Sequence, residues 1–132
     1  MKYLKGTLLV LAVAFLCKGF GVSALTYKIQ NITIPSFSGV WYSPSREKWE
    51  TNYQYVKKTS CSDNLTGDGR AISGKLHGQY SGMEDTSYVS LPLNSNVNMG
   101  YWSQQQGAWK LYLRSDKSLV TTATLSGVWT IE

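Results

Sequence analysis

The sequence predicts an all-β protein, a small antiparallel β-sandwich of about seven strands that is preceded by a cleaved signal peptide. Three observations support this fold class. Short runs of alternating apolar and polar residues follow one another, and Gly, Ser, Asn and Asp separate them. Aromatic and β-branched residues, which favour strands, are abundant. No stretch beyond the leader repeats apolar residues with the period of a helix.

Residues 1–24 have the three parts of a secretory signal peptide. Lys2 and Lys5 supply the positive charge, Thr7 to Cys17 the apolar run, and Val22-Ser23-Ala24 the small residues before the cleavage site. The apolar run is about half of the roughly 20 residues that span a bilayer, so we expect no transmembrane anchor. Cleavage would leave residues 25–132 as a single secreted domain.

Two strands are predicted in the first half of this domain. Tyr27–Ile34 is rich in β-branched residues, and Pro35 ends it. In Asn52–Ser60 the side chains alternate, which places Gln54, Val56 and Lys58 on one face and Tyr53, Tyr55 and Lys57 on the other.

Three shorter or weaker strands are predicted in the middle of the chain. Ala71–Tyr80 is interrupted by two glycines, Thr86–Leu91 stops at Pro92, and Val97–Ser103 follows a polar turn.

The C-terminal part carries the clearest alternation. In Trp109–Ser115, Trp109, Leu111 and Leu113 point to one face of the strand and the intervening residues to the other. Ser118–Thr124 and Val128–Glu132 complete the set, with Ser126-Gly127 as a bulge or corner between them. Ser-Gly-Val-Trp occurs at 38–41 and again at 126–129, which indicates two strands of similar local geometry.

The charge of the predicted mature domain is small. The whole chain has 13 Lys and Arg against eight Asp and Glu, but Lys2, Lys5 and Lys18 belong to the leader. The remaining ten basic residues are scattered apart from Lys57-Lys58. Because nucleic-acid-binding domains cluster their positive charge, we expect no nucleic-acid partner.

Cysteine usage points to a bacterial host and to a monomer. Cys17 lies in the leader, so Cys61 has no second cysteine in the domain with which to form an intrachain disulfide. Small secreted domains of animals and plants usually carry several disulfides. Cys61 stands at a polar strand end, and we predict a partly exposed thiol that folding does not require.

The sequence offers little for catalysis. His77 is its single histidine, and Gly-x-Ser-x-Gly is absent. Glu47 and Glu50 flank two residues, while Glu84 and Asp85 are adjacent in a predicted turn. We therefore expect no enzyme, with a Cys61–His77 dyad or a small hydrolase that uses His77 and a carboxylate as the catalytic alternatives.

Cofactors and metals are not expected either. Residues 63–69 contain Asp, Asn and Gly but lack the ligand spacing of an EF-hand, so a turn explains them better than a calcium site. No His/Cys cluster indicates zinc.

The aromatic residues exceed what a small core can hold. The predicted domain contains five Trp and eight Tyr, and these side chains need polar partners when they are buried. Rings beside Gln, Asn and Arg favour a surface that binds a glycan or a peptide, although the same residues also suit a packed strand edge. The candidate contact residues are Trp41, Tyr42, Trp49, Tyr101, Trp102 and Gln105.

The C-terminal part of the chain carries a family resemblance. A Trp-Lys-apolar strand, Trp109-Lys110-Leu111-Tyr112-Leu113, precedes a short aromatic terminal strand, Val128-Trp129-Thr130-Ile131. The chain resembles small secreted proteins of Gram-positive bacteria, which include lactococcin-type bacteriocins and uncharacterised relatives. The resemblance lies in these two strands, in the leader, in the size of the chain and in its many Tyr, Trp, Asn and Ser residues. The resemblance implies an all-β sandwich without a catalytic centre and, in the bacteriocin branch, action at the target cell wall. The chain departs from that branch in His77 and in its long Ser/Asn/Gly middle.

The sequence therefore predicts a secreted, non-enzymatic binding protein that acts at a cell surface, with a cell-surface glycan or protein as partner. The alternative is a bacteriocin-like antibacterial toxin.

Overall fold

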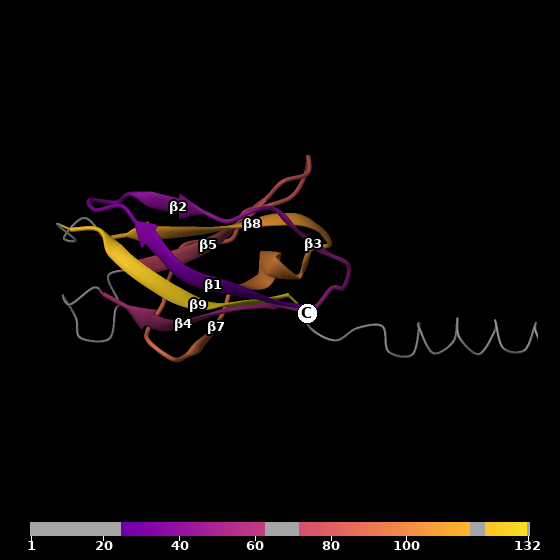
Figure 1. Cartoon of the computed structure of the whole chain (residues 1–132). Coiled ribbons are helices and arrows are strands. Elements are labelled where there is room, and N and C mark those ends of the chain that lie inside the picture. The colour runs from indigo at the N-terminus through magenta and orange to yellow at the C-terminus, as the bar shows by residue number, and fades with distance from the viewer. Residues whose placement is uncertain (1–24, 63–71, 117–120, 132) are drawn as a thin grey trace, which may run out of the picture.

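The computed structural model describes residues 25–62, 72–116 and 121–131, which form two antiparallel sheets stacked face to face (Figure 1). The predicted signal peptide and the acidic loop at 63–69 lie outside these residues. The all-β class and the two-sheet arrangement are thereby confirmed for the described part of the chain.

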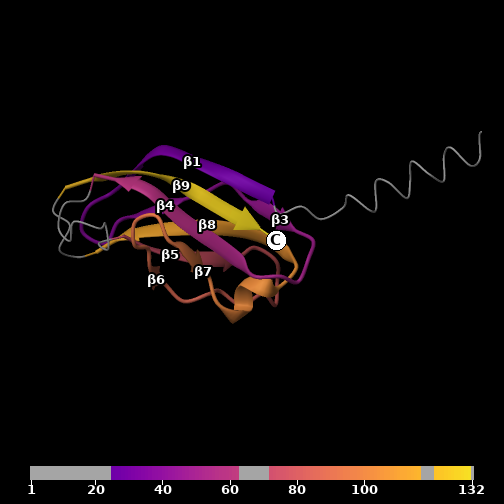
Figure 2. The ribbon, with the colours of Figure 1, turned by 90° about the horizontal axis from the view of Figure 1, so that it is seen from below.

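Nine strands and one short 3₁₀ helix make up the described fold. In chain order they are β1 (Leu25–Ile34), β2 (Val40–Tyr42), β3 (Arg46–Lys48), β4 (Gln54–Cys61), β5 (Ile72–Gly78), β6 (Val89–Ser90), β7 (Asn96–Asn98), η1 (Tyr101–Gln104), β8 (Gly107–Ser115) and β9 (Ala123–Ile131). The four-stranded sheet has the order β1-β9-β4-β7, and Figure 2 shows its three long strands side by side. The five-stranded sheet has the order β2-β8-β5-β6, and β3 also pairs with β8.

The core lies between the two sheets and follows the predicted alternation. From β8 it takes Trp109, Leu111 and Leu113, and from β9 Leu125, Trp129 and Ile131. In β4 the buried face is the one with Gln54, Val56 and Lys58, so two of its three side chains are polar. Alternate residues are thus buried along β4, β5, β9 and most of β8, as a two-layer fold requires, while the irregularity in β1 places its buried Ile29 and Ile34 five positions apart.

Two short strands, β2 and β3, are additional to the roughly seven predicted, and together they follow one edge of β8. Val40–Tyr42 pairs with the second half of β8 and Arg46–Lys48 with its first half. Between them, Ser43 donates its backbone N–H to Leu111 and accepts the Leu111 N–H on its hydroxyl. The Ser43 hydroxyl thus continues the ladder at a position where Pro44 interrupts the strand.

Two predicted strands are shorter in the structure. Thr86–Leu91 contains only Val89–Ser90 as strand, and Val97–Ser103 was wrong as a continuous strand. The extended chain ends at Asn98, because Gly100 takes a φ of 96° and the chain then turns into η1. A positive φ of this kind is easy for glycine and ends a strand.

In place of the two predicted C-terminal strands the structure has one strand, β9, from Ala123 to Ile131; of the predicted strand Ser118–Thr124 it contains Ala123 and Thr124, and residues 118–120 lie outside the described residues. The irregularity expected at Ser126-Gly127 is present, but on the neighbouring strands. The register shifts between Ile29 and Ile32 on β1 and between Lys58 and Ser60 on β4, both opposite Ser126-Gly127. β9 itself is one uninterrupted strand that pairs with β1 on one side and with β4 on the other.

Candidate functional site

Four of the six predicted contact residues lie at one end of the sandwich. This end is formed by β3, the β3–β4 connection, η1 and the β5–β6 connection (Figure 1). Its most exposed rings are Trp49 (71% exposed), Tyr80 (53%), Tyr101 (71%) and Trp102 (48%). We call these four rings the aromatic end. Gln105, directly after η1, lies beside them.

The other two predicted contact residues lie elsewhere. Trp41 is half-buried, pairs with Leu113 and packs against the core, so it supports the fold. Tyr42 is exposed on the outer face of the five-stranded sheet, where it meets Tyr112 edge to face at 4.5 Å between ring centres.

A buried hydrogen-bond network fixes the position of η1. The Gln54 side chain is fully buried and donates its amide N–H to the Ser103 carbonyl at 3.0 Å. Its amide oxygen accepts the Trp129 indole N–H at 2.9 Å. Ser103 is also buried, and its hydroxyl accepts the Gln54 backbone N–H. Because Ser103 is held in the interior, the preceding Tyr101 and Trp102 remain exposed at the surface.

One recess at the aromatic end combines rings with amides. It has a volume of about 320 Å³ and is lined by Thr51, Tyr101, Trp102, Gln104 and Gln105. We call it the ring–amide recess. Tyr101 and Trp102 contact each other edge to face at 5.1 Å between ring centres. The lining therefore offers apolar ring faces together with hydroxyl and amide hydrogen-bonding groups.

A second recess of about 320 Å³ contains a carboxylate. It is lined by Glu47, Lys48, Trp49, Tyr80, Gln106 and Gly107, and we call it the carboxylate recess. The Tyr80 hydroxyl donates a hydrogen bond to Glu47, and this bond raises the pKa of the Tyr80 hydroxyl. The Gln106 side chain donates to the Trp49 carbonyl and so ties the β3–β4 connection to the segment after η1.

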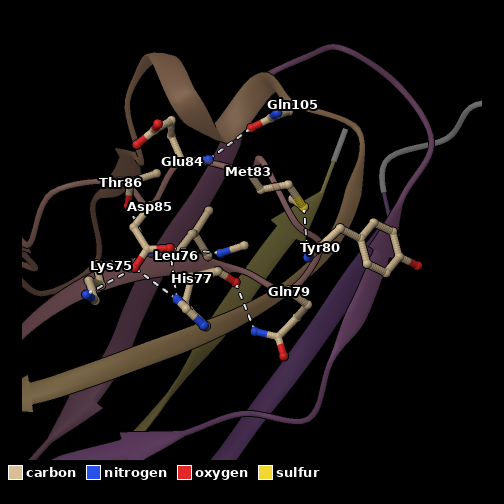
Figure 3. Close-up of polar contacts among 11 residues, drawn as sticks. Lys75, Leu76, His77, Gln79, Tyr80, Met83, Glu84, Asp85, Thr86 and Gln105 are labelled. Carbon is tan, nitrogen blue, oxygen red and sulfur yellow. Dashed lines mark hydrogen bonds and ion pairs between the residues drawn. The ribbon is translucent and has the colours of Figure 1, made fainter.

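The β5–β6 connection brings Tyr80 to this end (Figure 3). Met83 donates its backbone N–H to the Tyr80 carbonyl, and Gly82 takes a φ of 84°, which closes the turn predicted there. Glu84 donates its backbone N–H to the Gln105 side chain, while the Gln105 carbonyl accepts the Trp109 indole N–H. Gln105 therefore also positions the loops of the site.

Sequence reasoning missed several residues that line the two recesses, namely Glu47, Thr51, Tyr80, Gln104 and Gln106. Glu47 was considered only as half of a catalytic pair with Glu50. Tyr80 was assigned to a strand end, although its exposed ring contacts a residue 33 positions away. The Gln-Gln-Gln run at 104–106 was the available signal for the two amides.

His77 and Asp85 form a second polar group on the outer face of the five-stranded sheet (Figure 3). The His77 Nδ1–H donates to Asp85 at 2.8 Å, and Lys75 lies 3.4 Å from the same carboxylate. The His77 ring stacks on Tyr112. Burial raises the pKa of Asp85, but hydrogen bonds from His77, Gly78 and Lys75 outweigh it and lower that pKa overall.

This arrangement bears on the catalytic alternatives. Cys61 is half-buried at the end of β4 in the four-stranded sheet, and it packs against the core. His77 belongs to the other sheet, so the structure does not bring a Cys61–His77 dyad together. The expected partial exposure of Cys61 is confirmed. His77 does meet a carboxylate, Asp85, on an open sheet face where both side chains are more than a third exposed.

The contact with Asp85 predicts a pH dependence of stability. The pKa of Asp85 is lower in the folded protein than its unfolded value of 3.8, so the ionised carboxylate stabilises the fold above pH 3.8. This stabilisation is lost as the pH falls through the folded pKa. We expect Asp85→Asn to cost about 1 kcal/mol or less at neutral pH, because the site is partly exposed, and nothing at low pH. Urea unfolding of the parent protein and of Asp85→Asn, each at neutral pH and at low pH, measures this difference in the free energy of unfolding. Glu84→Gln is the matched control, and an equal loss for Asp85→Asn at both pH values would contradict the prediction.

Within the described ranges, no group of three His, Cys, Asp or Glu side chains is placed to hold a metal ion. None of the described residues forms a helix with the length and apolar character needed to cross a bilayer. Comparisons with protein-family models, curated proteins and solved structures found no match for the chain. The candidate function therefore rests on the geometry of the site.

Proposed function

We propose that this chain is a secreted, non-enzymatic binding protein that acts at a cell surface and uses the aromatic end to bind cell-wall glycan. The observation that supports the proposal is the gathering of four large, exposed rings around two recesses at one end of the fold. Isolated exposed rings are common on protein surfaces, whereas rings grouped around a recess are typical of binding sites.

The chemistry of the ring–amide recess suits an uncharged sugar. A pyranose ring has an apolar C–H face, which packs on Tyr101 or Trp102, and a rim of hydroxyl groups, which bond to amides such as Gln104. The network of Gln54 and Ser103 holds η1 in place before any ligand arrives. A preformed site of this kind loses less conformational entropy on binding.

The proposal of a binding protein rather than a glycosidase has its own support. A glycosidase of the common type needs two carboxyl groups about 5–9.5 Å apart across the bond that it cleaves. Among the described residues that line the two recesses, Glu47 supplies the single carboxylate.

Trp102→Ala is expected to weaken binding to isolated peptidoglycan about tenfold, because stacking on one well-placed ring contributes about 1–2 kcal/mol to the free energy of binding. Co-sedimentation of the purified protein with isolated peptidoglycan and with whole cells measures this, alongside the change in Trp fluorescence. Phe37→Ala is the matched control, since Phe37 is 63% exposed but lies in the β1–β2 connection.

Four outcomes discriminate between the functions. Absence of sedimentation with both cells and peptidoglycan overturns the proposal, as does equal binding by Trp102→Ala. Killing of related strains by the purified protein would favour the bacteriocin-like alternative. Release of soluble sugar or peptide fragments that stops in His77→Ala would favour the hydrolase.

A further inference from the structure

The carboxylate recess differs from its neighbour because its lining combines a carboxylate, Glu47, with the two exposed rings of Trp49 and Tyr80. We infer that it binds an organic ammonium group, so that the ligand of the aromatic end is a glycan that bears a positively charged nitrogen. This inference rests on the proposed function for the glycan, but the ammonium site itself follows from the recess alone.

The first step is the direction of the charges on β3. Arg46, Glu47 and Lys48 are consecutive in this strand, so Glu47 points to the face opposite to the two cations. The Arg46 guanidinium lies 4.3 Å from the centre of the Tyr27 ring, and Lys48 is only 1% exposed. By this alternation both cationic side chains point to the face opposite to the one on which Glu47 meets Tyr80, and Lys48, which also lines the recess, is almost fully buried.

The second step is the acceptor capacity of Glu47. The Tyr80 hydroxyl donates to Oε1 of this carboxylate. A carboxylate has two oxygens and about four acceptor positions, so one hydrogen bond leaves room for a further N–H donor or for a close cation. The hydrogen bond also fixes the carboxylate against the Tyr80 ring.

The third step is the nature of the walls. Trp49 and Tyr80 line the recess, and their rings are 71% and 53% exposed. The faces of Trp and Tyr rings attract cations, and Trp does so most strongly. Rings combined with one carboxylate attract an ammonium group both through the ring faces and through the charge, whereas an uncharged sugar gains only hydrogen bonds from the carboxylate and an anionic group is repelled by it.

The two recesses are also adjacent. Trp49 and Gln106 line the carboxylate recess, while their near neighbours in the sequence, Thr51 and Gln105, line the ring–amide recess. Both partners of the hydrogen bond from Gln106 to the Trp49 carbonyl line the carboxylate recess, and each has a near neighbour in the sequence that lines the other recess. A single ligand can therefore place an uncharged sugar unit in the ring–amide recess and an ammonium group in the carboxylate recess.

Titration of the purified protein with two ammonium probes, choline and glucosamine, tests the inference. Their neutral counterparts, 3,3-dimethyl-1-butanol and N-acetylglucosamine, serve as ligand controls. We expect saturable binding of at least one ammonium probe, followed by Trp fluorescence or calorimetry, and weaker binding of its neutral counterpart by about tenfold. Binding of choline alone would identify a quaternary ammonium substituent as the natural group, and binding of glucosamine an amino sugar.

Glu47→Gln keeps an acceptor for Tyr80 but removes the charge, and we expect it to lower the affinity for the ammonium probe about tenfold. Trp49→Ala should do the same through the loss of the ring. Glu50→Gln, an equal change of charge outside the lining of the recess, should leave the affinity within about twofold.

Absence of saturable binding by both ammonium probes overturns the inference, and so does equal affinity of Glu47→Gln and the parent protein. The proposed function fails separately. If Glu47→Gln sediments with peptidoglycan as well as the parent protein does, the proposed binding function stands, but the ammonium site plays no part in it. Probe binding without sedimentation keeps the ammonium site and removes the cell-wall ligand.

Discussion

Trp129→Ala is expected to lower the free energy of unfolding by about 3–5 kcal/mol, the usual cost of removing a buried Trp side chain. Trp129 is 1% exposed and lies in β9, between Tyr27 on β1 and Val56 on β4. Its ring packs on Tyr27 at 5.8 Å between ring centres, and its indole N–H bonds to Gln54. The substitution therefore leaves both a cavity and an amide oxygen that has lost its donor.

Urea unfolding followed by circular dichroism measures this loss. Trp49→Ala is the matched control, because the same side chain is 71% exposed there and its removal should change stability by less than about 0.5 kcal/mol. Trp129→Phe covers the case in which Trp129→Ala does not fold, since it keeps most of the ring and should cost less than the alanine variant. Equal stability of Trp129→Ala and Trp49→Ala would show that Trp129 does not support the core.

Features of the fold that depend on local sequence could be predicted. Alternation with a period of two gave the strand Trp109–Ser115 and its buried face, because the pleat of a strand alone decides which residues share a face. The same rule paired Gln54 with Val56 and Lys58 in β4. It did not decide that this face is the buried one, since burial depends on the opposite sheet.

Burial of the tryptophans illustrates the limit. Ser-Gly-Val-Trp occurs twice, yet Trp129 is almost fully buried and Trp41 is only half-buried. The difference comes from position in the sheets, because β9 has neighbours on both sides and β2 pairs with β8 at the edge of its sheet. A local sequence pattern contains no information on this difference.

The candidate site was predicted only in part, because local sequence indicates that rings are exposed but does not show which distant residues contact them. An excess of rings over core capacity indicated that some of them are exposed, and Trp49, Tyr101 and Trp102 are. Tyr80 and Glu47 were missed because the contact between them joins residues 33 positions apart. Val97–Ser103 was predicted as one strand because the alternation does not show that Ser103 is held inside by Gln54, 49 positions away.

The hydrogen bonds between Gln54 and Ser103 join the core to the candidate site, so a substitution of Gln54 is expected to change both stability and binding. Gln54→Leu has a similar volume but removes the amide, so the Trp129 indole N–H and the Ser103 carbonyl lose the hydrogen bonds that Gln54 supplies. A buried polar group without a partner costs about 1–3 kcal/mol. We therefore expect the free energy of unfolding to fall by about 2–4 kcal/mol, the combined cost of two such groups reduced by partial relaxation.

The same substitution should weaken ligand binding, although Gln54 is fully buried and lines neither recess. Ser103 would remain tied to the Gln54 backbone N–H, but the contact that fixes the Ser103 carbonyl would be lost, and Tyr101 and Trp102 would sample more orientations. Urea unfolding and peptidoglycan sedimentation measure the two effects. Gln30→Leu, at an exposed position of β1, should change neither. A loss of stability with unchanged binding would mean that η1 keeps its position without the Gln54 side chain. Binding strength is instead expected to follow the hydrogen bonds of Gln54, because they hold the exposed rings in the arrangement that meets the ligand.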